Sequence, residues 1–143
     1  MDKSGKTGIK GDKDPLDILV LTERNITHGN IIVPAIPIGG FRMIDDGEAD
    51  DKIIAVLKDD QMYSKYHDIF DCPDSIVNRL RHYFLTYKNI PGEESSNVEI
   101  DALYGKEDAL EVIRKSQLDY TENYGNIEEE MSQSIVNLFQ AAQ

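Results

Sequence analysis

The chain has 143 residues, of which 27 are acidic and 15 are basic, so that its formal net charge is −12. A hydrophobic content of 40% at this length indicates one folded domain, and the excess of negative charge excludes a protein that binds nucleic acid through its phosphates. No apolar run reaches the about 18 residues of a membrane-spanning helix, residues 1–14 lack the apolar core of a secretory signal, and the single cysteine, Cys72, fits the reducing cytoplasm.

The first half of the chain is predicted to consist of short strands. Residues 16–21 (LDILVL) and 52–57 (KIIAVL) are nearly all apolar, which predicts buried strands. Residues 31–38 (IIVPAIPI) predict another strand, at an edge or with a bulge, because its two prolines cannot donate to a ladder. Between them, residues 41–44 are a short apolar stretch after a glycine break, and residues 45–51 (DDGEADD) an acidic loop. Several short strands ahead of any long helix favour a barrel or meander core.

The second half of the chain has helical periodicity. A helix is predicted to begin at residues 74–75 (DS), either of which can cap it. Apolar residues then recur at helical spacing up to Tyr87, and residues 91–92 (PG) end the pattern. Residues 106–117 and 127–142 predict two further helices. Strands first and helices after them indicate the α+β class.

A cluster of three carboxylates leads into the first predicted strand. Asp12, Asp14 and Asp17 fall within six residues. Pro15 favours extended geometry at Asp14, so that Asp12 and Asp14 could point the same way. Asp17 lies among apolar residues, where a carboxylate is costly unless it is paired or bound to a metal. A solvated acidic turn is the commoner fate of such a cluster, and both interpretations stay open at this point.

A second acidic cluster, residues 45–52 (DDGEADDK), leads into the strand at 52–57. Its five carboxylates repel one another, and a divalent cation could offset that cost. Lys52 follows directly and could place an ammonium beside a bound phosphate. This cluster alone favours an exposed acidic loop, but two clusters of the same layout favour oxygen-ligand sites for Mg²⁺ or Mn²⁺. No cluster of His and Cys accompanies them, which argues against zinc.

Tyr87 and Lys88 close the first predicted helix. They could donate hydrogen bonds to a phosphate oxygen. They could equally complete the apolar stripe and place a cation at the negative end of the helix dipole. On their own, these two residues favour the structural interpretation.

Four motifs together resemble one protein family. Residues 12–17 (DKDPLD) are similar to the D-x-D-P-x-D signature of the soluble family I inorganic pyrophosphatases. The resemblance continues through residues 37–43 (PIGGFRM), the D-x4-D-x-K pattern of residues 45–52, and residues 82–88 (HYFLTYK). The motifs are collinear, with family-like intervals, across about residues 8–90.

The resemblance implies a fold and an extent of the domain. We expect an OB-like five-stranded β-barrel core, incomplete in this chain, flanked by C-terminal α-helices. In the family, the barrel begins well upstream of the signature, and residues 1–11 do not match that part. We therefore expect residues 1–143 to form a single partial pyrophosphatase domain, with the tail from about residue 120 unassigned. We also expect this chain by itself to be weakly active or inactive.

The resemblance implies hydrolysis of diphosphate to two orthophosphates with Mg²⁺, for which Mn²⁺ is a possible substitute. A metal-activated water would attack phosphorus in line. Asp12, Asp17 and Asp50 would ligate the first metal, and Asp17 would also hold the second. Asp45 and Asp50 would hold a further metal that arrives with the substrate.

The remaining implied roles concern water and substrate. Asp14 would orient and deprotonate the attacking water, and Lys52, Tyr87 and Lys88 would bind phosphate oxygens. The implied partner is diphosphate as its magnesium complex, and we expect a homo-oligomer, as is common in the family. We expect neither nucleic acid nor a membrane as a partner. An alternative is a non-catalytic module of the same fold that binds divalent cations or another protein.

Overall fold

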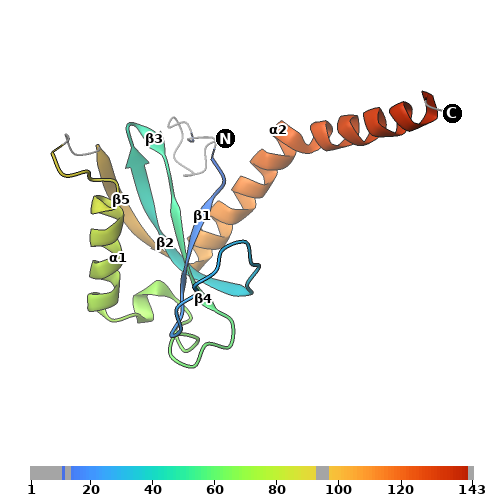
Figure 1. Cartoon of the computed structure of the whole chain (residues 1–143). Helices are drawn as coiled ribbons and strands as arrows, with labels where there is room; N and C mark the ends of the chain where they lie inside the picture. Colours follow the sequence, from blue (N-terminus) through green and yellow to red (C-terminus); the bar gives the residue numbers. More distant parts are fainter. Residues whose placement is uncertain (1–10, 12–13, 93–96, 142–143) are drawn as a thin grey trace.

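The computed structural model describes residue 11 and residues 14–92 and 97–141 of the chain. The chain folds as a curled mixed sheet with a helix on each side (Figure 1). Its elements follow in chain order: β1 (Asp17–Leu21), β2 (Ala35–Asp45), β3 (Glu48–Ala49), β4 (Lys52–Leu57), η1 (Ile69–Asp71), α1 (Asp74–Thr86), β5 (Val98–Gly105) and α2 (Lys106–Ala141). No helix in these ranges is both long and apolar enough to cross a membrane.

Strand β2 is the centre of the sheet. Its first part pairs antiparallel with β4, its last two residues pair with β3, and its other edge pairs antiparallel with β5. β1 lies on the outer side of β4 and runs parallel to it, with Asp17 opposite Lys52. Strands followed by a long helix confirm the predicted α+β class.

The boundaries of β2 differ from the sequence prediction. The sequence predicted a strand over residues 31–38, a glycine break and a separate apolar stretch, whereas β2 runs from Ala35 to Asp45 without interruption. The pairing of β2 with β4 shifts register between Pro37 and Gly39. This irregularity confirms the bulge that the prolines predicted, and it lies in a central strand, not an edge strand.

Two neighbouring glycines lie in the middle of β2 because larger residues would not fit. A Cβ on Gly39 would come within 2.6 Å of the side chain of Ile69 and of the carbonyl oxygen of Tyr104. A Cβ on Gly40 would come within 2.6 Å of the Tyr104 ring. The glycine pair therefore lets η1 and β5 approach the strand closely, and does not end it.

Three more boundaries differ in the second half of the chain. Residues 98–105 (VEIDALYG) form β5, which was not predicted. The helices predicted at 106–117 and 127–142 are one helix, α2, because the segment between them has no proline and its one glycine costs only about 1 kcal/mol. Helix α1 ends at Thr86, ahead of the predicted stop at residues 91–92.

The two helices cover opposite faces of the sheet. Successive β4 residues point to opposite faces, and Ile53 and Ile54 belong to separate apolar clusters. The first turns of α2 pack on the Ile53 face, and α1 packs on the Ile54 face. On the α1 face, the row of β4 side chains begins at Lys52. The apolar layer therefore ends in a charged group at the end of the sheet where α1 also ends.

Candidate active site

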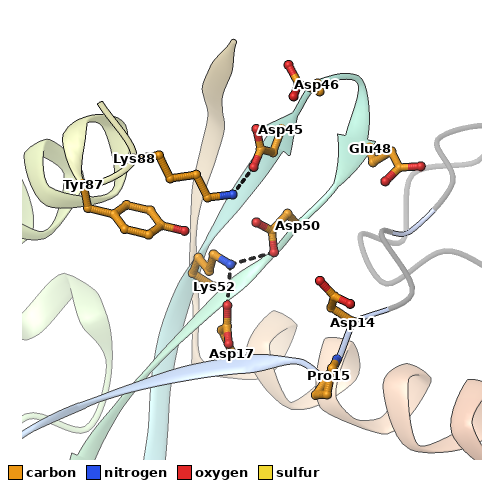
Figure 2. Close-up of a pocket in the computed structure, with 10 residues that line it drawn as sticks. All are labelled: Asp14, Pro15, Asp17, Asp45, Asp46, Glu48, Asp50, Lys52, Tyr87 and Lys88. Atoms are coloured by element: carbon orange, nitrogen blue, oxygen red, sulfur yellow. Dashed lines mark hydrogen bonds and ion pairs between the residues drawn. The ribbon is translucent and has the colours of Figure 1, made fainter. Parts of the chain in front are cut away.

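A cavity of about 550 Å³ lies at this end of the sheet (Figure 2). Its walls come from the segment before β1, the turn between β2 and β3, the start of β4 and the end of α1. The lining residues are Asp14, Pro15, Asp17, Asp45, Asp46, Glu48, Asp50, Lys52, Tyr87 and Lys88. The fold thus gathers around one cavity two acidic segments and one basic helix end that are far apart in the sequence.

Lys52 joins the two acidic segments inside the cavity. Because Asp17 lies opposite Lys52 in the parallel pairing of β1 with β4, their side chains emerge on the same face of the sheet. The Lys52 Nζ donates to Asp17 Oδ2 and to Asp50 Oδ1, both at 2.6 Å (Figure 2). The Lys52 side chain is only 3% exposed, against 12% for Asp50 and 68% for Asp17.

The electrostatics of Lys52 follow from these contacts. Burial alone lowers the pKa of Lys52, but the hydrogen bonds to Asp17 and Asp50 outweigh it, so that the pKa lies above its ordinary value. Lys52 is therefore a cation at neutral pH. Its single positive charge offsets one of the two carboxylate charges and reduces the repulsion between Asp17 and Asp50.

The alternation of side chains separates a carboxylate that lines the cavity, Asp50, from one that is buried away from it, Asp51. Asp50 is fixed by its backbone N–H, which donates to the carbonyl of Met43 at 3.0 Å. Asp50 and Lys52 are two residues apart and share the cavity face, while Asp51 between them is fully buried. The hydroxyl of Tyr104 donates to Asp51 at 3.3 Å, and burial, then the charge of Asp51, holds the pKa of Tyr104 far above its usual range.

A tight turn positions Asp45 at the other side of the cavity. Asp46 and Gly47 both have positive φ, 47° and 82°, which fits an Asp-Gly pair between two antiparallel strands. The Lys88 Nζ donates to Asp45 Oδ2 (Figure 2). That hydrogen bond, to a carboxylate with 17% of its side chain exposed, raises the pKa of Lys88 well above its usual range.

The end of α1 supplies a phenol beside this ion pair. Tyr87 follows the last helical residue, and its ring stacks on Tyr83 one turn earlier, with 5.3 Å between ring centroids. Figure 2 shows the Tyr87 hydroxyl pointing into the cavity towards Lys52. The structure therefore places Tyr87 and Lys88 on the cavity, whereas the sequence alone favoured a structural interpretation of both.

Most of the residues singled out in the sequence line this cavity: Asp14, Asp17, Asp45, Asp50, Lys52, Tyr87 and Lys88. Asp12 lies outside the described residues. Asp46 and Glu48 also line the cavity although neither was a candidate. Both belong to the acidic run at residues 45–51, which the sequence marked as a possible source of metal ligands. The run alone did not show which of its carboxylates face the cavity.

The cavity fits a hard divalent cation by the chemistry of its oxygen donors. Carboxylates are the side chains that Mg²⁺ prefers, and no His or Cys lines the cavity among the described residues. In the present side-chain positions, no three carboxylate, His or Cys side chains of those ranges converge on one point. Lys52 lies between Asp17 and Asp50, so a cation bound by both would have to replace its ammonium.

The fold resembles those of solved inorganic pyrophosphatases. The type I inorganic pyrophosphatase of Plasmodium falciparum superposes with a TM-score of 0.73 at 29% identity, covering 88% of this chain and 42% of that one. The inorganic pyrophosphatase of Thermus thermophilus superposes with a TM-score of 0.68 at 30% identity, covering 76% of this chain and 62% of that one. These neighbours confirm the predicted OB-like core with helices after it.

The sequence also matches inorganic pyrophosphatases over most of its length. A model described as inorganic pyrophosphatase matches residues 5–121. The inorganic pyrophosphatase of Chlamydia muridarum is 55% identical over 122 residues, and that of Chlamydia caviae is 52% identical over 127 residues. The matches cover 82% and 86% of this chain. The chain therefore belongs to the inorganic pyrophosphatase family, as its motifs predicted, and it spans 58% and 59% of the length of these two relatives.

Proposed function

We propose that the protein hydrolyses inorganic diphosphate to two orthophosphates, with Mg²⁺ as the metal and Mn²⁺ as a possible substitute. The observation that carries this proposal is the single cavity in which Asp17 and Asp50 share one lysine and Asp45 holds another. Family membership supports the same reaction. The substrate would enter as its magnesium complex, so that the negative cavity does not repel it.

The carboxylates would hold the metal ions in this proposal. Asp12, Asp17 and Asp50 would be the ligands of the first ion, Asp17 would also serve a second, and Asp45 with Asp50 a further one that accompanies the substrate. Bound Mg²⁺ would lower the pKa of a water molecule and neutralise charge on phosphate oxygens. Lys52 hydrogen-bonds two of these carboxylates in the ion-free protein, and would turn to a phosphate oxygen when cations replace it.

The chain's own side chains would then carry the chemical step. Asp14 lines the cavity and would accept a proton from the attacking water. The water oxygen would form a bond to one phosphorus while the bridging P–O bond breaks, and the bridging oxygen would leave with the second phosphate. Lys52, Tyr87 and Lys88 would donate hydrogen bonds to the non-bridging and leaving oxygens, where negative charge increases.

The extent of the chain bears on its activity. It spans only 58% of the Chlamydia muridarum relative. Strand β1 is at the edge of the described sheet, and its Ile18 side chain is 48% exposed. We include in the proposal that residues 1–143 are one partial pyrophosphatase domain. Residues that complete the barrel would cover this edge, and the chain by itself would be weakly active or inactive.

A chimaera tests the proposal. The part of the Chlamydia muridarum protein that precedes the position aligned with Asp12 is fused ahead of residue 12. Orthophosphate release is then measured with Mg²⁺ and diphosphate for the chimaera and for the 143-residue chain. We expect turnover by the chimaera, and at least about 100-fold less in its Asp14→Asn variant, because the proton acceptor is lost while the shape is kept.

The alternative function, a non-catalytic module that binds divalent cations, is favoured by the short span of the chain. The same samples separate the two functions by calorimetric titration with Mg²⁺. A folded chimaera that binds Mg²⁺ with a saturable heat but releases no orthophosphate would replace the enzymatic proposal with this alternative.

A further inference from the structure

Helix α2 continues far beyond the body of the protein (Figure 1). Its first turns anchor it, since Ala109 and Val112 are buried against the sheet and Ile113 packs beside them. The described side chains from Gln117 onwards are exposed or half-buried. The match to the family model ends at residue 121, so the distal part of the helix, residues 122–141, lies beyond the matched region.

The distal part of α2 carries an apolar stripe with a heptad period. Tyr120, Tyr124, Ile127 and Met131 follow one another at spacings of four, three and four residues. Their side chains are between 45% and 60% exposed. These three spacings average about 3.7 residues, close to the 3.6 residues of a helical turn, so the four side chains lie along one face of α2. Alternating spacings of four and three are also those of the seam between two paired helices in a coiled coil.

We propose that this stripe pairs, antiparallel, with the same stripe of a second copy of this chain. In an antiparallel coiled coil, each a position faces a d position of the other helix. A two-fold axis beside residue 122 brings each a position of one stripe opposite a d position of the other. Tyr120 then faces Tyr124 of the second copy, and Gln117 faces Ile127.

Charge complementarity supports the antiparallel direction. Arg114 and Lys115 are the basic residues of α2 beyond its first residue, and three consecutive glutamates follow at residues 128–130. The register centred on residue 122 brings Arg114 next to the acidic segment of the second copy. Parallel pairing would instead bring the two acidic segments together, which like charges oppose.

The direction of pairing also sets the shape of the dimer. α2 begins at Lys106, 16 residues before the two-fold axis, which is about 24 Å of helix at 1.5 Å per residue. The two bodies would therefore lie at opposite ends of the paired helices, with the starts of α2 about 48 Å apart. Each cavity would remain open, because the pairing uses no residue that lines it.

Sedimentation velocity at increasing concentrations of the full chain tests the pairing. We expect a dimer whose dissociation constant rises at least tenfold in Ile127→Glu, because a charge would lie in the seam. Asn126→Glu is the matched control, since it adds the same charge at an exposed position outside the stripe. Circular dichroism checks that both variants keep their helix content. A monomer at every concentration, or equal weakening in both variants, would overturn the proposal.

Disulfide cross-linking tests the direction. A mixture of Gln117→Cys chains and Ile127→Cys chains is oxidised beside each variant alone, with the native Cys72 buried in the core. The proposal predicts a cross-linked dimer that contains one chain of each kind. Efficient cross-linking of Ile127→Cys with itself would show a parallel pairing, and a dimer that persists in Ile127→Glu would show a different interface; either result contradicts the proposal.

Discussion

Aspartates in two regions of this protein accept hydrogen bonds from different kinds of donor. In the cavity, Asp17 and Asp50 both accept hydrogen bonds from the end of a side chain, the Lys52 ammonium. In the loop after β4, the buried Asp60 accepts hydrogen bonds from backbone N–H groups, at 2.8 Å from Glu23 and Tyr63 and at 2.9 Å from Met62.

The difference between these groups is whether the partner can be exchanged. Backbone amides are fixed by the fold, so the loop around Asp60 is held in one arrangement. A lysine side chain can rotate away, so we expect the carboxylates that it pairs with to pass to a metal ion under the proposed function. The same residue type would then be structural in one place and a ligand in the other.

Removal of the Lys52 ammonium should lower the stability of the fold more than the other substitutions, and a divalent cation should restore that stability. Lys52→Met removes the ammonium that Asp17 and Asp50 share, so that the two carboxylates repel each other. We expect the free energy of unfolding to fall by about 2–3 kcal/mol without metal. Saturating Mg²⁺ should restore most of that loss by binding the folded state. Urea denaturation with EDTA and with Mg²⁺ measures both values. A loss that Mg²⁺ leaves unchanged would show that the lysine is not a stand-in for a cation.

Asp60→Asn should destabilise the protein in a way that Mg²⁺ does not reverse. Backbone hydrogen bonds from Glu23 and Tyr63 hold the pKa of Asp60 below its ordinary value. A carboxyl group with a lowered pKa stabilises the fold above its unfolded pKa, near 4, and this contribution is lost as the pH falls further.

The pH dependence separates this variant from Lys52→Met. The stability difference between wild type and Asp60→Asn should be full and constant from pH 6 to 8 and should shrink below about pH 4. Denaturant midpoints across this range measure it. A difference that grows on acidification would contradict the role of Asp60 as a charged acceptor.

The smallest effect should come from the Tyr87 hydroxyl. Tyr87→Phe keeps the ring that stacks on Tyr83 and removes one proposed hydrogen bond to phosphate. In the chimaera we expect about tenfold lower kcat/KM for diphosphate, or about 1.4 kcal/mol, with the unfolding midpoint unchanged. An unchanged kcat/KM would contradict the proposed hydrogen bond from the Tyr87 hydroxyl to phosphate.

Local patterns were enough where one short segment decides the structure. The strand at Lys52–Leu57 has the predicted bounds, because six mostly apolar residues behind an acidic loop leave few alternatives. The motif spacing was also enough to mark Asp17, Asp50 and Lys52 as neighbours of one site, through the resemblance to a family.

Long-range pairing decided what the sequence could not. The contact of Asp17 with Lys52 depends on the parallel register of β1 with β4 across 35 residues, which periodicity does not encode. Gly39 looked like a chain break, because the need for room beside Ile69 exists only in the folded sheet. The continuity of α2 through Gly125 is likewise set by the whole helix, since one glycine is too weak to end it.

Calorimetric titration of the wild type and of Asp50→Asn with Mg²⁺, at neutral pH and without substrate, measures whether the carboxylates of the cavity bind a metal ion. Exchange of the Lys52 ammonium for a metal ion predicts a saturable site in the wild type and at least tenfold weaker binding in Asp50→Asn. No saturable heat in the wild type, or equal affinity in the variant, would contradict the claim that these carboxylates form a metal site.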